Sequence, residues 1–353
     1  MNADVILIFS FGLATVTIGL FIIPYYIRFL IAYKLGKNIR ENATIGKALE
    51  FMKLHEKKWG TPTMGWAIIL LVVFFMVASS LLLQKLWFMN HSLFNQKETY
   101  LSLFTLATVW FLWGVDDYLN IKNIGKSKWM SVRVKMFGLI IFATLWALWF
   151  YYKLGWGLTD AQGHFVRSLS IPFWQNIKLG WYFIPLFIFV IVAGSNSVNI
   201  TDGLDGLAGG LLLFNYLVYA YICYDQWLLL LATLCVTIIW ALIAFLWFNI
   251  KPARFYLGDV GSLALWANLW IMAMLTNTLF VIVIIGAVFI LETLSVIIQL
   301  TSKKFRKWKK VFKIAPYHHH LEAIGWSEET IVFRMWLISM ILSVIGIIFY
   351  KLQ

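Results

Sequence analysis

Acidic residues gather in three short strings whose types and spacing suit phosphate chemistry. The chain has only 16 Asp and Glu among 353 residues. Asp116 and Asp117 are adjacent in WGVDDYLN, Asp202 and Asp205 lie in NITDGLDGLAGG, and Asp259 lies in YLGDVGS. Mg²⁺ usually takes one or two carboxylates and completes its octahedron with water and substrate phosphate oxygens. The strings therefore favour metal-assisted transfer of a phosphate-linked group, which needs charge neutralisation and in-line positioning.

Glycines and histidines accompany these acids. The loop around Asp202 contains Gly203, Gly206, Gly209 and Gly210, which let backbone amides approach a ligand closely, and an apolar helix whose N-terminus favours anions follows. His318, His319 and His320 form a triplet in APYHHHLEAIGW. Purely structural interpretations stay open, because Asp at a helix end can be a cap and Asp-Gly is ordinary turn chemistry.

Glu292 lies inside an apolar run, where a carboxylate costs several kcal/mol unless it is paired. We expect it to face the site or a buried partner. The two cysteines, Cys223 and Cys235, sit in apolar stretches without metal-ligand spacing and indicate no disulfide framework.

The composition indicates which elements must position these residues. Hydrophobic residues make up 61% of the chain and charged residues only 13%, whereas a soluble domain carries about a quarter charged residues. We therefore expect an all-α, polytopic integral membrane protein. The run from Val5 to Tyr33 follows Asp4 and no basic region, so it predicts a retained first span and not a cleaved signal peptide.

About ten stretches are long enough to cross a bilayer, which takes about 20 apolar residues. They are 5–33, 64–84, 99–115, 136–152, 181–198, 207–224, 227–248, 261–276, 278–300 and 331–350, those at 99–115 and 261–276 being short. We expect a single transmembrane domain over 1–353. Its active-site loops are 34–63, 116–135, 194–206, 249–262 and 301–330.

The cations predict the orientation. Twenty-two of the 29 Lys and Arg residues fall in loops on one side of these spans, and five fall on the other. Loops rich in Lys and Arg stay in the cytoplasm, so both termini should lie outside. All three acidic strings and the histidine triplet lie on the cation-rich side, which predicts one site at the inner membrane surface.

The net charge of +13 comes from the same excess of Lys and Arg in the loops on one side of the spans. In the basic run from Lys303 to Lys313, Phe305, Trp308 and Phe312 interleave the cations, a pattern typical of a segment on an anionic membrane surface. We expect membrane lipid as a partner and no nucleic acid.

Seven strings in series resemble one family. They are KWGTPTMG (58–65), VDDY (115–118), NITDGLDGLAGG (199–210), FLWFNIKPA (245–253), GDVGSLAL (258–265), ETLSVIIQ (292–299) and PYHHHLEAIGW (316–326). Together they resemble the phospho-N-acetylmuramoyl-pentapeptide transferases, within the polyprenyl-phosphate N-acetylhexosamine-1-phosphate transferase superfamily, over nearly the whole chain.

The resemblance implies a reaction and a location. UDP-MurNAc-pentapeptide and undecaprenyl phosphate would give UMP and lipid I, the lipid-linked product of the first membrane step of peptidoglycan synthesis, with Mg²⁺ as cofactor. The protein would be a multi-pass protein of the bacterial inner membrane with its active site facing the cytoplasm, and we expect a homodimer.

The resemblance also implies roles for individual residues. Asp259 would bind the metal, Asp116 would deprotonate the lipid phosphate with Asp117 beside it, and His318 would complete the catalytic set. A two-step scheme with an aspartate nucleophile stays open. Substrate contacts would come from Lys58, Lys135, Asn196, Asn199, Asp202, Asp205, Asn249, His319 and His320.

The sequence departs from the family pattern at four positions. Trp66 and Trp266 replace common glycines, Lys251 replaces a common histidine, and Asn120 replaces a common lysine. The last change removes a phosphate contact that Lys122, Lys126 or Lys135 could supply.

Two other functions compete. A related transferase using UDP-GlcNAc would share the acid pair and the magnesium site, but would lack the GTPTMG string and carry a different histidine motif. A transporter would place its ionisable residues near the bilayer midplane.

Overall fold

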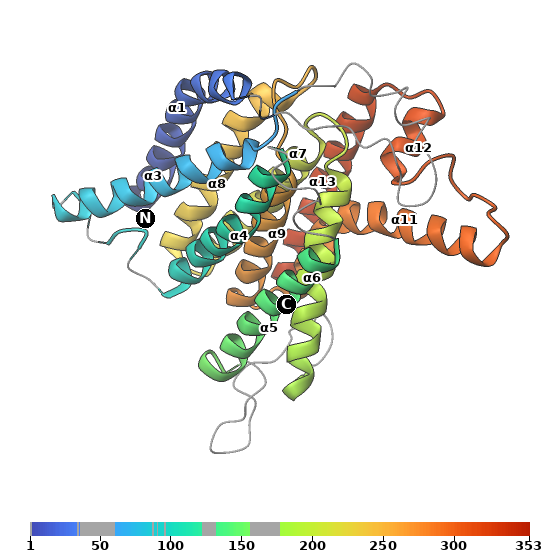
Figure 1. Cartoon of the computed structure of the whole chain (residues 1–353). Coiled ribbons are helices and arrows are strands. Elements are labelled where there is room, and N and C mark those ends of the chain that lie inside the picture. The colour runs from blue at the N-terminus through green and yellow to red at the C-terminus, as the bar shows by residue number, and fades with distance from the viewer. Residues whose placement is uncertain are drawn as a thin grey trace.

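The computed structural model describes residues 2–33, 35, 61–86, 88–89, 91–94, 97–121, 132–155 and 177–353. Within these residues every extended regular element is a helix, and no β-strand occurs (Figure 1). This confirms the expected all-α class.

The described residues form twelve α-helices and one 3₁₀ turn. In chain order they are α1 (Asn2–Ala32), α3 (Gly65–Lys85), α4 (Lys97–Ile121), α5 (Val132–Lys153), the 3₁₀ turn η2 (Gly180–Tyr182) leading into α6 (Phe183–Thr201), α7 (Leu207–Asp225), α8 (Leu229–Asn249), α9 (Asp259–Leu275), α10 (Leu279–Ile285), α11 (Ala287–Phe305), α12 (Tyr317–Ala323) and α13 (Glu328–Lys351).

Seven helices of the described residues are long and apolar enough to cross a membrane, and the bent pair α10–α11 makes an eighth candidate. The apolar part of α4 (Thr99–Phe111) and α9 are shorter, as the sequence predicts. Large apolar side chains point outward along the bundle, among them Phe9 and Phe21 of α1 and Phe333 and Leu337 of α13. Because water would not tolerate so wide an apolar surface, lipid must cover it. The protein is a polytopic membrane protein.

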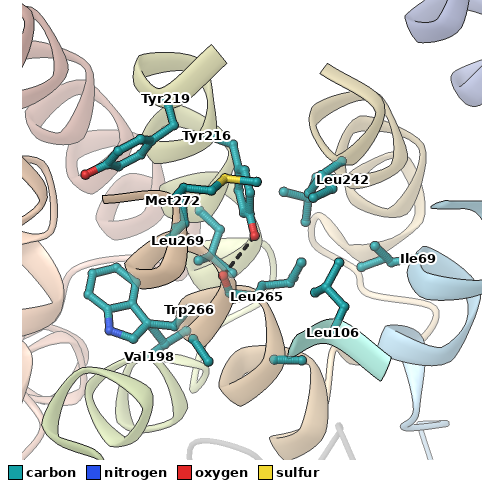
Figure 2. Close-up of a cluster of buried hydrophobic side chains, with 14 of the residues drawn as sticks. Ile69, Leu106, Val198, Tyr216, Tyr219, Leu242, Leu265, Trp266, Leu269 and Met272 are labelled. Carbon is teal, nitrogen blue, oxygen red and sulfur yellow. Dashed lines mark hydrogen bonds between the residues drawn. The ribbon is translucent and has the colours of Figure 1, made fainter. Parts of the chain in front are cut away.

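Helix α9 runs through the interior of the bundle. Every residue from Val260 to Met274 is buried, and α4, α6 and α7 pack around the helix. Figure 2 shows the surrounding core, in which the Tyr216 hydroxyl of α7 donates to the carbonyl of Leu265 at 2.8 Å. The side-chain amide of Asn268 donates to the Ser102 carbonyl of α4 at 2.9 Å. These bonds satisfy polar groups that hydrocarbon could not solvate. Enclosure on all sides fixes the position at which α9 begins.

The stretch 278–300, expected as one span, is not one straight helix, because α10 and α11 meet at a bend of 69°. The bend falls at Gly286. A Cβ at this position would lie 2.6 Å from the Trp266 ring of α9 and 2.8 Å from the Ile282 carbonyl. Trp266 is buried, and its ring also lies edge-on to Phe289, the third residue of α11, at 5.0 Å between centroids. Gly286 lets the chain turn around this indole, and glycines are common sites of such kinks.

Helix α11 projects sideways from the bundle (Figure 1). It is amphipathic, but its polar side is buried and its apolar side is exposed, the reverse of a helix in a soluble protein. After its first turn the buried residues are all polar and form a stripe of Glu292, Ser295, Gln299 and Ser302. Its exposed side is apolar, including Leu291, Leu294, Ile297 and Ile298. Each stripe recurs every three or four residues, as one face of a helix requires. The polar stripe is therefore available to hold the chain that follows, while the apolar side faces lipid.

Helix α13 is tied at both ends. At its beginning, Glu328 accepts a hydrogen bond from the backbone N–H of Asp205 at 2.8 Å. At its other end, the Tyr350 hydroxyl and the Lys351 ammonium donate to the Asp225 carboxylate at 2.8 and 2.6 Å. The helix thus connects the loop before α7 with the end of α7.

Candidate active site

The predicted loops 194–206 and 249–262 meet at one end of the bundle through Asp205. Its carboxylate accepts a hydrogen bond from the Ala253 backbone N–H at 3.1 Å, and its own N–H donates to Glu328. Glu328 also pairs with Lys251 at 3.4 Å, and Lys251 lies 3.0 Å from Glu329. Burial lowers the pKa of Lys251, but the two ion pairs outweigh it and raise this pKa above its usual value. The site thus has a charged support that joins three segments.

Glu328 is a site residue that was not predicted from the sequence. Its carboxylate is almost fully buried, and it lies at the end of the predicted loop 301–330. The rarity of acids in this chain was the signal that could have identified it.

Asn249 holds the same two loops together by its side chain. Its Oδ1 accepts from the Gly206 backbone N–H at 3.1 Å, and its Nδ2 donates to the Phe255 carbonyl at 2.8 Å. Gly206 has a φ of 80°, a conformation that glycine adopts without strain. In this structure Asp205 and Asn249 therefore both fix backbone near the predicted substrate site.

A buried carboxylate–histidine pair confirms the expectation for Glu292. His318 and Glu292 are 0% and 1% exposed, and Glu292 Oε2 lies 3.0 Å from His318 Nδ1 and 3.2 Å from its backbone nitrogen. A carboxylate oxygen accepts, so Nδ1 carries the proton and Nε2 is left as an acceptor in the neutral ring. Nε2 has no hydrogen-bond partner among the described residues. It lies against Gly203, where a Cβ would overlap it.

The structure divides the histidine triplet. His319 stays beside His318, with ring centroids 4.2 Å apart, and a Cβ at Gly203 would lie 3.1 Å from its Nε2. Its Nδ1 lies 2.6 Å from the carboxylate of Glu322. His320 instead accepts from the Lys313 backbone N–H at 3.3 Å, and its ring packs against Phe312. The first two histidines, and not the third, therefore border the Asp202 loop.

The segment 61–66 supports the beginning of α9. Tyr256 N–H donates to the Pro62 carbonyl at 2.9 Å, and Gly65 N–H donates to the Tyr256 carbonyl at 2.7 Å. The Tyr26 hydroxyl of α1 donates to the Met64 carbonyl at 3.0 Å. Asp259 is the first residue of the helix and half-buried, and Gly258 takes the N-cap position with a φ of 87°. Asp259 is therefore not the N-cap that a purely structural interpretation would make it.

Trp66 connects two of the acidic strings. A Cβ at Gly114 of α4 would lie 2.9 Å from its indole, and a Cβ at Gly261 of α9 would also contact it. Gly114 precedes the pair Asp116–Asp117 by two residues, and Gly261 follows Asp259 by two residues. One buried tryptophan thus sets the spacing between α4 and the beginning of α9.

Two further predicted contacts lie on α6. Asn196 and Asn199 are half-buried, and the Asn196 amide donates to the Val192 carbonyl at 2.7 Å and lies 3.5 Å from Met136 Sδ of α5. Met136 follows Lys135, so the structure brings the backbone of α5 at Lys135 to α6. Lys58 lies outside the described residues, as do the side chains of Asp116, Asp117 and Lys135.

A magnesium ion would need few protein ligands here. No group of three or more His, Cys, Asp or Glu side chains with metal-binding geometry occurs among the described residues. Mg²⁺ bound through one or two carboxylates and substrate phosphate does not require such a group. The half-buried Asp259 at the beginning of α9 fits that donor set.

Comparison with known proteins gives the class. The profile of Glycosyl transferase family 4 matches residues 100–277, a range that contains the acid pair, the Asp202 loop and Asp259. With its membrane helices and its carboxylate-rich end, the protein is a phospho-sugar transferase of that family.

Relatives define the branch. The chain is 38% identical over 328 residues to the phospho-N-acetylmuramoyl-pentapeptide-transferase of Geobacillus sp. (strain WCH70), covering 92% of each chain. It is 37% identical to that of Anoxybacillus flavithermus over 98% of each chain, and 36% identical to that of Bacillus subtilis over 94% of each. The chain belongs to the phospho-N-acetylmuramoyl-pentapeptide-transferase family, which confirms the resemblance seen in the sequence.

Proposed function

We propose that this protein transfers phospho-MurNAc-pentapeptide from UDP-MurNAc-pentapeptide to undecaprenyl phosphate, releasing UMP and forming lipid I. The similarity to relatives of that name over more than nine tenths of their length carries the proposal. The pairing of His318 with Glu292 beside Gly203 supports it, because it places an imidazole nitrogen next to the glycine-rich loop of Asp202.

In the proposed reaction a phosphate oxygen of undecaprenyl phosphate attacks the β-phosphorus of the nucleotide. The bond from that phosphorus to the bridging oxygen of UMP breaks, and UMP leaves with the electron pair. Asp116 accepts the proton of the lipid phosphate, and Asp117 orients it. Asn196, Asn199, Asp202 and the first two histidines bind the nucleotide and sugar-phosphate. A charge-neutralised, in-line arrangement is what such transfers need.

We further propose that the enzyme depends on Mg²⁺, with Asp259 as a ligand. The ion would neutralise charge on the diphosphate. Asp259→Asn keeps the size of the side chain but removes its charge, and should lower turnover by about a hundredfold or more, in line with several kcal/mol of metal stabilisation. Magnesium titration of the variant should also show a raised requirement. Normal turnover and an unchanged magnesium requirement would indicate that another carboxylate binds the metal.

The function is tested with the purified protein in detergent. UDP-MurNAc-pentapeptide, undecaprenyl phosphate and Mg²⁺ should yield UMP and a lipid-linked product, and UDP-GlcNAc in the same assay should yield neither. Turnover of UDP-GlcNAc alone would assign the protein to the related hexosamine-phosphate transferases. Absence of UMP with both donors would exclude both functions.

We also propose that the active site faces the cytoplasm of the bacterial inner membrane and that the protein forms a homodimer. The cation asymmetry of the loops supports the orientation. Light scattering of the purified protein, corrected for bound detergent, should give twice the mass of one chain.

A further inference from the structure

The basic segment, residues 303–313, has no role in the proposed transfer. It contains seven Lys and Arg residues and no acid. Two aromatic side chains within it are among the most exposed large hydrophobic side chains of the described residues, with Phe305 74% and Trp308 66% exposed. Such exposed aromatic side chains among cations indicate that another molecule covers them.

Buried polar residues of α11 hold the basic segment in one conformation. Gln299, 4% exposed, accepts from the backbone N–H groups of Val311 and Phe312 at 2.9 and 3.0 Å and donates to the Phe312 carbonyl at 2.8 Å. The Ser302 hydroxyl donates to the Lys309 carbonyl at 2.9 Å. The segment is therefore folded back against the polar stripe of α11.

The turn itself directs the aromatic side chains outward. Lys307 and Trp308 have φ values of 47° and 66°, which few non-glycine residues adopt. The Trp308 N–H donates to the Lys303 carbonyl at 3.0 Å and closes the end of the helix. Lys307 and Trp308 thus both adopt the left-handed conformation, at the point where the Trp308 indole is exposed.

The position of the basic segment identifies its surroundings. It lies at the tip of α11, which projects from the bundle (Figure 1). The lipid-facing side of α11, with Ile297 and Ile298, leads directly to Phe305 and Trp308. Aromatic residues followed by cations at the end of an apolar face are typical of the boundary between hydrocarbon and headgroups.

We propose that the basic segment binds the anionic phospholipid headgroups of the leaflet at which α11 ends, with Phe305 and Trp308 inserted between them. The positive charge complements the headgroups. Continuity with the lipid-facing side favours a membrane over a soluble acidic partner, which would not need the apolar side. This inference is independent of the proposed reaction.

A fluorescent label on Val311→Cys tests the proposal while leaving both aromatic residues in place. The native Cys223 and Cys235 are fully buried, so the new thiol at a half-exposed position reacts selectively. The labelled protein is reconstituted into phosphatidylcholine vesicles that contain nitroxide-labelled lipid, with or without about one third phosphatidylglycerol. Quenching should be clearly stronger with phosphatidylglycerol and should weaken in high salt, which screens exposed charges.

Matched charge variants separate the basic segment from general surface charge. The variant with Lys304, Lys307 and Lys310 all replaced by Gln should lose most of the phosphatidylglycerol-dependent quenching, since each cation contributes about fivefold in affinity and the three together about a hundredfold. In the control variant, Lys85, Lys153 and Lys178 are replaced by Gln. The dependence of quenching on phosphatidylglycerol should then be unchanged.

Three results would overturn the proposal. An unquenched label in both kinds of vesicle would place the segment in water, open to a soluble acidic partner. A response that the three Gln substitutions leave intact would remove the headgroup contact. A response to about one per cent undecaprenyl phosphate, but not to phosphatidylglycerol, would assign the segment to the acceptor lipid instead.

Discussion

At the scale of single residues, the Glu292–His318 pair holds one imidazole at the edge of the Asp202 loop. A carboxylate in an apolar run must find a partner, and Glu292 finds one in the ring and the backbone N–H of His318. The helical turn of α12 separates His320 from the first two histidines of the triplet, so His318 is the histidine that this carboxylate orients.

Glu292→Gln should lower kcat by roughly 10–100-fold, the usual effect of losing the group that orients a histidine. Glutamine can still accept a hydrogen bond through its oxygen, but its NH₂ group can donate instead, so it no longer selects the tautomer with the proton on Nδ1. His318→Gln should cost at least as much. Because both residues act as one unit, the double variant should be no slower than His318→Gln alone. Multiplicative losses in this double-mutant cycle would show that the two residues act separately.

Asp116→Asn should lower kcat by about 10²–10⁴-fold, the range for a lost general base, while nucleotide-sugar binding survives. A phosphate monoester has a second pKa near 6, so a lipid phosphate already deprotonated at higher pH needs less help. The deficit of the variant should therefore shrink between about pH 6 and 9. A rate ratio that stays constant with pH, together with release of UMP by the unaltered enzyme without lipid, would favour the two-step scheme.

At the scale of elements, the break between α10 and α11 decides how the site is built. Gly286 stands in an apolar run that is long enough for a span, and a glycine alone does not forbid a continuous helix in a membrane. The bend depends on Trp266, which is distant in sequence and contacts Gly194 of α6 as well as Gly286. The ranges of the helices were predictable from local hydropathy, whereas this bend was not.

Trp266→Ala should therefore reduce activity by more than its effect on stability explains. Removing a buried tryptophan costs about 3–5 kcal/mol, and Trp270→Ala is the matched control, because Trp270 is buried beside Trp266 but one turn further from Gly286. Only Trp266→Ala should displace α11, which spin labels at exposed positions 298 and 337 would report as a changed distance distribution. Equal losses of activity and identical distances in the two variants would exclude a role of Trp266 in the bend.

At the scale of the whole molecule, side-chain contacts tie the chain together at the two ends of the bundle. The Asp205, Asn249 and Glu328 contacts lie at one end of the bundle, and Asp225, Asn277 and the C-terminal Gln353 meet at the other. Which loops share a side of the membrane stays a prediction, made by counting charge loop by loop. The support that Glu328 provides could not be predicted, because it joins residues more than 100 positions apart in the chain.

Reporter fusions after residues 40, 125 and 310 should give a cytoplasmic signal, and fusions after 95 and 165 an external one. The physical reason is the retention of Lys- and Arg-rich loops on the cytoplasmic side. Fusions after both 310 and 165 in the same strain background serve as each other's control. An external signal at 310 would separate the histidine loop from the acidic strings and remove the single-site argument.

The double attachment of α13 makes the thickness of the bilayer relevant to the site. The helix has 24 residues and is about 36 Å long, longer than the roughly 30 Å of hydrocarbon it would cross. Because Asp225 holds one end and the Asp205 loop holds the other, the helix can meet a thinner membrane by tilting but not by sliding. Tilt would move Glu328 relative to α6 and α7. We therefore expect the acyl-chain length of the surrounding lipid to set the geometry around Asp205, so that the membrane acts as a mechanical element of the protein.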